Sequence, residues 1–284
     1  MAGPGNSVSG AVPEEYGRLL ALAEDDDPCT AEAVDRRMFE IGRPFLEYMV
    51  RLRETSRSPV PWNVLEGKIL NLNGRLSLGD LNMQLGSGYP DLTACIYLVC
   101  RICDPYLPRH SMDSLFSPLV SAVLAEFTEY KTAVEKTEIL SYVFFRRFSI
   151  VTSAGPGGLC LSVFDVLGRG CGYLLPLSVI YMMLARQTGM EIYPACNRLG
   201  FIPAYVRDGR AVFFINLPDR GRIMPVRLFD SLFADARRKG GRFLISTDTA
   251  VVRMYADVMR SYYASSGDAA RSGPVSYTHL RAHE

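Results

Sequence analysis

The chain has 284 residues, which is enough for one or two domains with sizeable cores. Hydrophobic residues make up 48% and charged residues 21%, an ordinary globular composition. A net charge of +1 provides no overall field to attract nucleic acid or an anionic membrane, so we expect neither as a partner. The first residues lack the basic and apolar segments of a signal peptide, and no apolar run reaches the roughly 18 residues of a membrane span. We therefore expect a cytoplasmic protein, in which seven cysteines do not form a disulfide framework.

The first half of the chain predicts a helical region at 15–150, behind a flexible lead at 1–14. Cap residues, a 3.6-residue apolar period and breaks at Gly or Pro delimit its helices. The predicted helices are Glu15–Glu24, Pro28–Gly42, Pro44–Leu52, Trp62–Leu72, Leu92–Cys103, Leu115–Phe127 and Ala133–Phe148.

The centre of the chain changes pattern from a helix to strands. Pro176–Gln187 is apolar up to Arg186 and predicts a buried helix. Three short apolar runs follow, and Asp208-Gly209 between the last two predicts a two-residue hairpin turn. The predicted strands are Ile192–Cys196, Phe201–Val206 and Ala211–Leu217. This order predicts an α/β (α+β) fold, in which the helical half packs on a core at 151–235 made of one central helix and a small antiparallel sheet.

Two further helices are predicted after the sheet, at Arg227–Arg238 and Thr247–Tyr263, the second within a C-terminal helical segment at 236–268. A Tyr-rich helix end followed by Gly267-Asp268 is typical of the first helix of a tetratricopeptide repeat. One fragment shows no period of about 34 residues, so it stays open whether such repeats follow.

The last segment, Pro274–Glu284, reads PVSYTHLRAHE and resembles a translated sequencing adapter. We expect it to be non-native, to pack against nothing, and to replace a native chain that continues beyond Gly273. His279 and His283 then fall outside the native sequence, which leaves His110, in a predicted surface loop, as the native histidine.

Four stretches resemble one family. They are LLALAEDDDPCTAEAVDRRMFEIGRPFLEYM near the start, SYVFFRRF before the central helix, VLGRGCGYLLPLSVIYMMLARQTGMEIY around it and VFFINLPDRGRI after it. The chain resembles bacterial SirB-type proteins of the transglutaminase-like superfamily, in a Bacteroidetes-like branch, over roughly Leu19 to Asp268. The resemblance is diffuse in the first half and specific from Val166 to Ile223. It implies a fold that presents a catalytic Cys, His and Asp or Asn at one site.

The chain departs from that family pattern where the chemistry would lie. Gly172 is kept, but Tyr173 and the residues after it replace the expected segment, in which superfamily enzymes carry the nucleophilic cysteine. The histidine position falls on Gly200, and only the third position, Asn216, holds an expected residue. The resemblance therefore implies a catalytically degenerate domain.

Two interpretations remain for each candidate group. Cys171 lies near the predicted helix start, where the helix dipole favours a thiolate, or it is a small loop residue. Cys95, Cys100 and Cys103 have a spacing that could suggest a metal, but too few ligands accompany them, so core packing is favoured. Cys196 is expected in the core as well. We expect the Asn216 side chain to bond to nearby backbone, and we expect no metal and no cofactor.

We interpret the protein as a non-catalytic scaffold or binding module for a protein or peptide partner. Its expected groove is lined by Gly172, Tyr173, Leu174, Gly200, Phe201 and Asn216. The alternative is a cysteine-dependent amidase or acyltransferase that uses Cys171 with an atypical base. A third possibility is a helical adaptor, in which repeats beyond the known sequence bind and this fold caps them.

Overall fold

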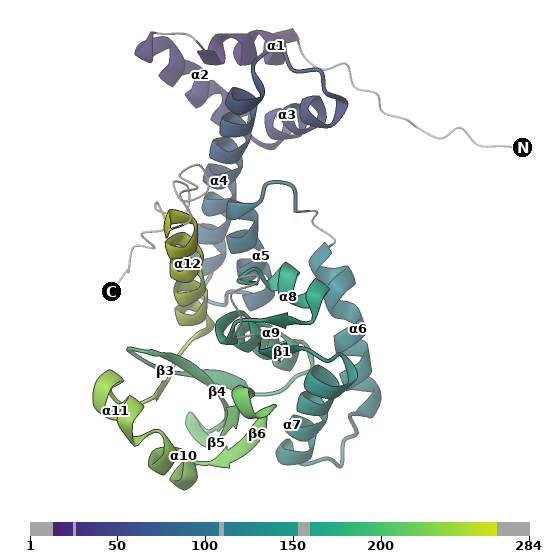
Figure 1. Ribbon diagram of the computed structural model, residues 1–284, viewed down its shortest axis with the longest axis vertical. Helices are drawn as coiled ribbons and strands as arrows, with labels where there is room; N and C mark the ends of the chain where they lie inside the picture. Colours follow the sequence, from purple (N-terminus) through teal and green to yellow (C-terminus); the bar gives the residue numbers. More distant parts are fainter. Residues whose placement is uncertain (1–13, 25–26, 108–110, 153–159, 266–284) are drawn as a thin grey trace, which may run out of the picture.

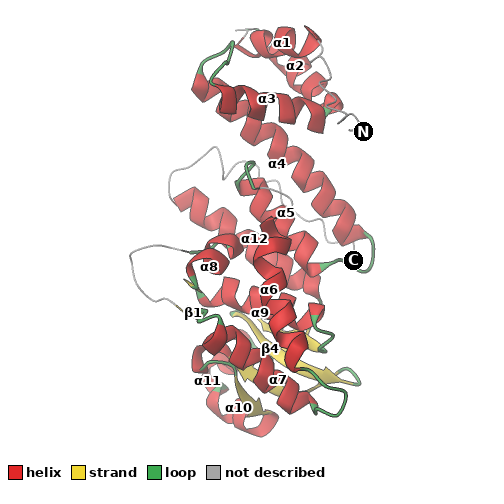
Figure 2. Ribbon diagram, turned by 90° about the vertical axis from the view of Figure 1, so that its right-hand side faces the viewer, coloured by secondary structure: helices red, strands yellow, loops and turns green. Residues whose placement is uncertain are grey.

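The computed structural model describes residues 14–24, 27–107, 111–152 and 160–265. The lead at 1–13, His110, Gly267-Asp268 and the whole Pro274–Glu284 tail lie outside these residues. The described chain forms an elongated molecule, with a group of helices at one end and a sheet at the other (Figure 1). Helices α5 (Leu92–Cys103) and α12 (Asp248–Ser265) lie between the two ends (Figure 2).

The α-helices are α1 (Glu14–Ala21), α2 (Pro28–Ile41), α3 (Arg43–Thr55), α4 (Trp62–Gly86), α5 (Leu92–Cys103), α6 (Ser111–Glu126), α7 (Ala133–Tyr142), α8 (Val163–Arg169), α9 (Leu174–Gln187), α10 (Val226–Leu232), α11 (Ala234–Gly240) and α12 (Asp248–Ser265). The strands are β1 (Val151–Thr152), β2 (Cys171–Gly172), β3 (Ile192–Asn197), β4 (Gly200–Arg207), β5 (Arg210–Asn216), β6 (Arg222–Pro225) and β7 (Leu244–Ile245). Short helical turns at Leu22–Glu24 (η1), Val143–Arg147 (η2, a π-helical turn) and Leu217–Asp219 (η3) complete the elements.

The predicted mixed fold is confirmed. Five strands form an antiparallel sheet in the order β6-β5-β4-β3-β7, and β1 pairs with β2 in parallel. The predicted hairpin joins β4 to β5, with Ala204 opposite Phe214. Its turn residues Asp208 and Gly209 have φ of 51° and 71°, as such a two-residue turn requires.

Helix α9 lies at the centre of the fold. Its ten consecutive residues Pro176–Ala185 are all buried, which explains why the segment carries no charge. The helix begins at Leu174, two residues before the predicted start. On the sheet, Tyr205, Phe213 and Ile215 belong to the same hydrophobic core as α9, and we call this the inner face.

The other side of the sheet, the outer face, packs against α10 and α11. Its buried residues form a separate small core of Ala195, Ala204, Phe214, Met224 and Phe229. A third core, formed by residues from Leu20 to Leu72, holds α1–α4 together at the far end of the molecule. The described molecule therefore has three hydrophobic clusters.

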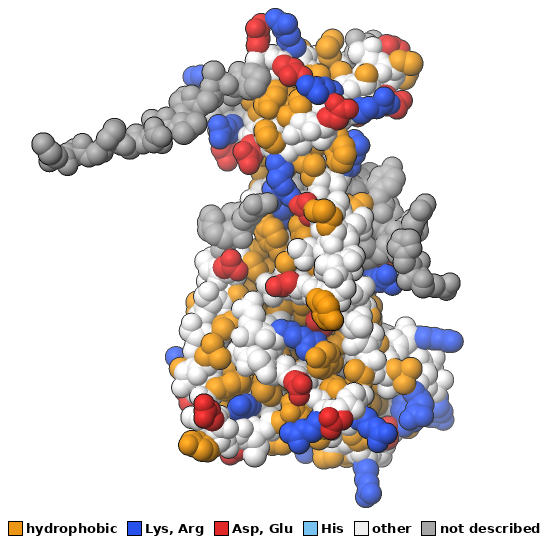
Figure 3. All heavy atoms as spheres, turned by 180° about the vertical axis from the view of Figure 1, so that it is seen from behind, with side chains coloured by type: hydrophobic (Ala, Val, Ile, Leu, Met, Phe, Trp, Pro, Cys, Tyr) orange, Lys and Arg blue, Asp and Glu red, His pale blue; other side chains and the backbone are white. Residues whose placement is uncertain are grey.

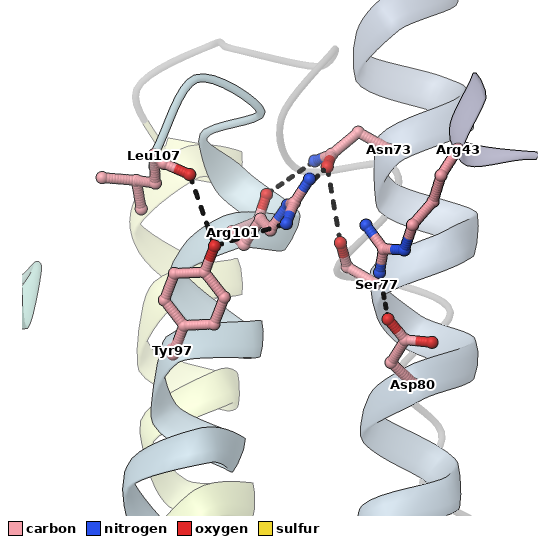
Figure 4. A network of polar contacts seen from close by, with 7 residues as sticks. All are labelled: Arg43, Asn73, Ser77, Asp80, Tyr97, Arg101 and Leu107. Atoms are coloured by element: carbon pink, nitrogen blue, oxygen red, sulfur yellow. Dashed lines mark hydrogen bonds and ion pairs between the residues drawn. The ribbon is translucent and has the colours of Figure 1, made fainter. Parts of the chain in front are cut away.

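Helix α4 is longer than predicted, because it continues from Leu72 to Gly86. The added turns are held to helix α5 by the buried Asn73 side chain. Its amide donates to the carbonyl oxygen of Arg101 at 2.6 Å, and Ser77 donates to its oxygen at 3.4 Å (Figure 4). Arg43 and Asp80 form an ion pair about one turn further along the same face of α4 (Figure 4). The hydrogen bond from Asn73 to α5 thus ties the middle of α4 to the neighbouring helix.

The prediction of one continuous helix at Arg227–Arg238 is wrong. The structure has two helices, α10 and α11, which break at Phe233 with φ of −102° and ψ of 21°. At this break the Phe233 ring stacks on the Phe229 ring with centroids 4.6 Å apart. This aromatic contact stabilises the break between the two helices. Strands β6 and β7, which the sequence did not predict, frame this region.

The predicted helix at Thr247–Tyr263 corresponds to α12, which packs against α5 and α9. Its buried Tyr255 hydroxyl donates to the carbonyl oxygen of Leu161 at 2.9 Å and accepts from the backbone N–H of Val163 at 3.1 Å. Arg186 at the end of α9 forms an ion pair of 2.8 Å with Asp248 at the start of α12. Among the described residues, no helix is both long enough and apolar enough to cross a membrane.

Candidate functional site

A small cavity lies where the start of α9 meets the ends of β4 and β5. We call it the helix-start pocket, and its volume is about 70 Å³. Its lining consists of Leu174, Ser178, Phe201, Ile202, Pro203, Ile215, Asn216, Leu217, Pro218, Met224 and Phe233. Of the six predicted groove residues, the structure brings Leu174, Phe201 and Asn216 together in this lining. Gly172, Tyr173 and Gly200 lie outside it.

The walls of the helix-start pocket are mainly apolar. Ser178 contributes little polarity, because its hydroxyl donates within α9 to the carbonyl oxygen of Leu174 at 2.7 Å. Tyr173 caps the helix in an extended conformation without a side-chain hydrogen bond, and Pro176 in the first turn has no N–H to offer. The start of α9 therefore presents an aliphatic surface to the pocket.

Asn216 contributes a polar side chain to this otherwise mainly apolar pocket. It is the last residue of β5, and its carbonyl oxygen accepts from the N–H of Gly221 at 2.9 Å. Its side chain makes no hydrogen bond to the residues described, so the predicted bond to local backbone is not formed. The amide, one donor group and one acceptor, stays available to a ligand.

Cys171 lies in a different position from the one that a nucleophile would need. It forms β2, where it pairs with Val151 of β1, and it is half-buried. It does not line the helix-start pocket, and Gly172 and Tyr173 separate it from the first residue of α9. The structure therefore does not place Cys171 and Asn216 around one cavity.

Gly172 was predicted to line the groove, but in the structure it allows close packing of β2 against α8. A Cβ atom at this position would lie 2.3 Å from the Val166 side chain and 2.9 Å from the carbonyl oxygen of Cys160. Only glycine lets β2 approach α8 this closely. The correction shows that a glycine before a helix can be required by the neighbouring helix rather than by a ligand.

Gly200, at the expected histidine position, begins β4 with φ of 150°. No atom outside its own neighbours lies within 4 Å of the place of a Cβ, so room exists, but the backbone conformation disfavours any side chain. The described residues include no histidine at all. Within them, no imidazole is present to activate a thiol.

The cysteines of α5 are held in hydrophobic surroundings, while Cys29 is exposed. Cys95, Cys100 and Cys103 are buried in α5, as predicted for core residues. Burial raises the pKa of Cys95 to about 12 and that of Cys100 to about 11. Cys196, which was predicted in the core, is only half-buried because it lies near the end of β3. Burial still raises the pKa of its thiol, and a hydrogen bond from Ser246 opposes this shift. No group of three or more side chains suited to a metal occurs in the described part of the chain.

Several pocket residues could not be found from the sequence. Met224 and Phe233 come from β6 and from the break between α10 and α11, two features that were not predicted. Ile202 and Pro203 were predicted as strand residues, but nothing marked them as part of a site. The signal that could have found them is the Leu-Pro-Asp turn after Asn216, which returns the chain across the end of the sheet.

Comparisons of the chain with models of protein families, with curated proteins and with solved structures find no match.

Proposed function

We propose that the protein is a non-catalytic, transglutaminase-like binding domain of SirB type, which holds a peptide segment of a protein partner at the helix-start pocket. The observation that carries this proposal is the pairing of an apolar cavity with the unbonded Asn216 amide. A peptide offers both complements, because it has aliphatic side chains and backbone groups that need hydrogen bonds.

The size of the pocket favours a single anchoring side chain. Its volume of about 70 Å³ is far below the roughly 300 Å³ at which small-molecule sites begin. It is also about half of the ~150 Å³ cavity that accepts benzene. One aliphatic side chain of a partner fits, while Asn216 bonds to the partner's backbone beside it. Leu174 is 44% exposed and offers further apolar contact outside the cavity.

The lack of catalysis rests on the same region. A thiol nucleophile needs a base, and a base needs a group that orients it. Cys171 has no imidazole among the described residues and lies outside the pocket that Asn216 lines. Gly200 occupies the expected base position with a backbone conformation that favours glycine.

Selection from a displayed library of random heptapeptides tests the binding function, followed by affinity measurement on the selected peptides. We expect these peptides to share one aliphatic residue. Leu174→Trp covers the pocket and should abolish binding. Asn216→Ala should weaken it about three- to tenfold through loss of a hydrogen bond.

The matched control for the first substitution is Leu124→Trp, because Leu124 lies on α6 with a similar exposure of 49%. It should bind the peptides as the unchanged protein does. If Leu174→Trp and Asn216→Ala both retain full affinity, peptide binding at this pocket is wrong.

The cysteine-dependent amidase or acyltransferase remains the second candidate, because Cys171 is half-exposed and lies three residues before α9. Iodoacetamide labelling between pH 5 and 9 separates the two functions. We expect slow labelling of Cys171 below pH 6.5 and no turnover of a glutamine-containing peptide. Rapid labelling there, together with turnover that Cys171→Ser abolishes, would establish the enzyme instead.

A further inference from the structure

We propose that a second pocket, on the outer face of the sheet, binds a small phosphate monoester with a flat apolar body. This arginine pocket has a volume of about 510 Å³, within the roughly 300–1,000 Å³ of small-molecule sites. It is lined by Gly209, Arg210, Ala211, Phe214, Val226, Phe229, Asp230, Arg237, Arg242, Phe243, Leu244 and Ile245. It shares no lining residue with the helix-start pocket, so the inference is independent of the peptide-binding proposal.

The pocket exists because small residues leave part of the outer face uncovered. Gly209 in the β4–β5 turn has no side chain, and Ala211 follows it on β5 with only a methyl group. On the other side, α11 ends at Gly240 and the chain turns at Gly241, with φ of 82°, before it enters β7. The outer face thus has a hollow between the β4–β5 hairpin and the segment that leads into β7.

Aromatic rings form one wall of the arginine pocket. Phe214 and Phe229 stack with centroids 3.7 Å apart, and Phe243 meets Phe229 edge-on at 5.2 Å. Phe214 and Phe229 are only 6% and 1% exposed, so the half-buried Phe243, Val226 and Ile245 form the apolar surface that a ligand can reach. A flat ring or other apolar body of a ligand can pack on such a surface, which water solvates poorly.

The charges around the pocket determine which charge a ligand should carry. Three guanidinium groups, those of Arg210, Arg237 and Arg242, line it with one carboxylate, that of Asp230. Arg237 is bonded to Asp230 at 2.7 Å. Arg210 and Arg242 form no ion pair or hydrogen bond with any residue of the described chain. Their guanidinium N–H groups are therefore available to bind an anion.

The excess of two positive charges matches a phosphate monoester, which carries nearly two negative charges at pH 7. The planar guanidinium fork also fits phosphate oxygens with two parallel hydrogen bonds. The chain as a whole carries only +1, so this positive character is local. Figure 3 shows Lys and Arg side chains gathered on the side of the sheet end where α11 lies.

Calorimetric titration with four probes tests both halves of the ligand. The probes are 1-naphthyl phosphate, uncharged 1-naphthol, singly charged 1-naphthoate and inorganic phosphate. We expect 1-naphthyl phosphate to bind most tightly, because it alone combines the flat body with two charges. Equal or tighter binding of naphthol or inorganic phosphate would overturn the proposal, and tighter binding of naphthoate would overturn the assignment of phosphate.

Substitutions then locate the binding. Arg210→Gln and Arg242→Gln remove one unpaired charge each and should each weaken 1-naphthyl phosphate about tenfold. Ala211→Phe fills the hollow and should abolish binding without changing the charge. Arg253→Gln is the matched control, since Arg253 is an exposed arginine on α12, outside the pocket.

A thermal unfolding curve for each variant confirms that it is folded before affinities are compared. Arg210 and Arg242 are exposed, so we expect both arginine variants to fold. They give the decisive result if Ala211→Phe fails to fold. If the arginine variants bind 1-naphthyl phosphate as tightly as Arg253→Gln does, the arginine pocket is not its site and the proposal is wrong.

Discussion

The two faces of the five-stranded sheet differ in how completely they are covered. The inner face packs against α9, whose ten central residues are all buried, and it belongs to the largest hydrophobic core. The outer face has a core of five buried residues, and the arginine pocket of about 510 Å³ opens on it. The inner face is therefore covered by the main core, whereas part of the outer face stays open to solvent.

The largest expected effect comes from a buried phenylalanine on each side of this comparison. Phe144 lies in the large core, 5.5 Å from the Tyr181 ring, and Phe229 lies in the outer core, 3.7 Å from Phe214. We expect Phe144→Ala to lower the free energy of unfolding by about 5 kcal/mol and Phe229→Ala by about 3 kcal/mol. The outer site costs less because an open pocket adjoins it, so neighbours and water can fill the space.

Urea unfolding measures both values, with the slope against urea as a check on two-state behaviour. If Phe144→Ala does not fold, Phe144→Leu and Phe229→Leu provide the same comparison with smaller cavities. An equal or larger loss at Phe229 would mean that the outer face is as tightly packed as the inner one, which would break the comparison.

The sequence was sufficient to predict the inner side of the fold. An apolar helix with no charge until Arg186 specifies complete burial, and Asp208-Gly209 specifies the hairpin. The outer side was not predictable, because β7 has only two residues and the α10–α11 break at Phe233 depends on ring stacking across elements. The candidate site lies where both regions meet, and the sequence found one of its residues on each of α9, β4 and β5, namely Leu174, Phe201 and Asn216.

The polar atoms of the inner side provide the second test. Gly221 follows η3 with φ of 78°, and a Cβ there would lie 2.2 Å from the Ser141 hydroxyl oxygen. That hydroxyl is already bonded to the Tyr181 hydroxyl at 2.8 Å, so it cannot move freely. We expect Gly221→Ala to lower the free energy of unfolding by about 3 kcal/mol, from overpacking together with backbone strain.

Gly209→Ala is the matched control, because Gly209 has a similar φ of 71° but open space around the place of a Cβ. It should lose only the strain contribution, about 1 kcal/mol. The difference between the two variants, measured in the same urea experiment, isolates the packing contribution. Equal losses would show that the contact with Ser141 is relieved by movement and that the inner side is less rigid than proposed.

The last test perturbs the fold least, because two native thiols report on the large core and on the β3–β7 edge of the sheet. Cys100 is buried in the large core, where burial raises its pKa to about 11 from 9.0. Cys196 is half-buried in β3, where it pairs with Leu244 of the short strand β7. Because the raised pKa of Cys100 favours the neutral thiol in the folded state, its contribution to stability is complete below about pH 9. That contribution is lost as the pH rises from about 9 to 11. We therefore expect Cys100 to contribute nothing to any change in the free energy of unfolding between pH 7 and 8.5.

Alkylation with iodoacetamide at pH 8 then compares how often each region opens. Cys100 requires unfolding of the large core, which for a global stability of at least about 5 kcal/mol protects a thiol about 10³-fold or more. Cys196 needs only local opening where β7 pairs with β3 through two residues. Mass spectrometry of digested samples should therefore find Cys196 labelled about 10³-fold faster than Cys100, with Cys196→Ser removing that phase. Equal rates would mean that both regions open together, and the β3–β7 edge of the sheet would then open no more often than the core around α9.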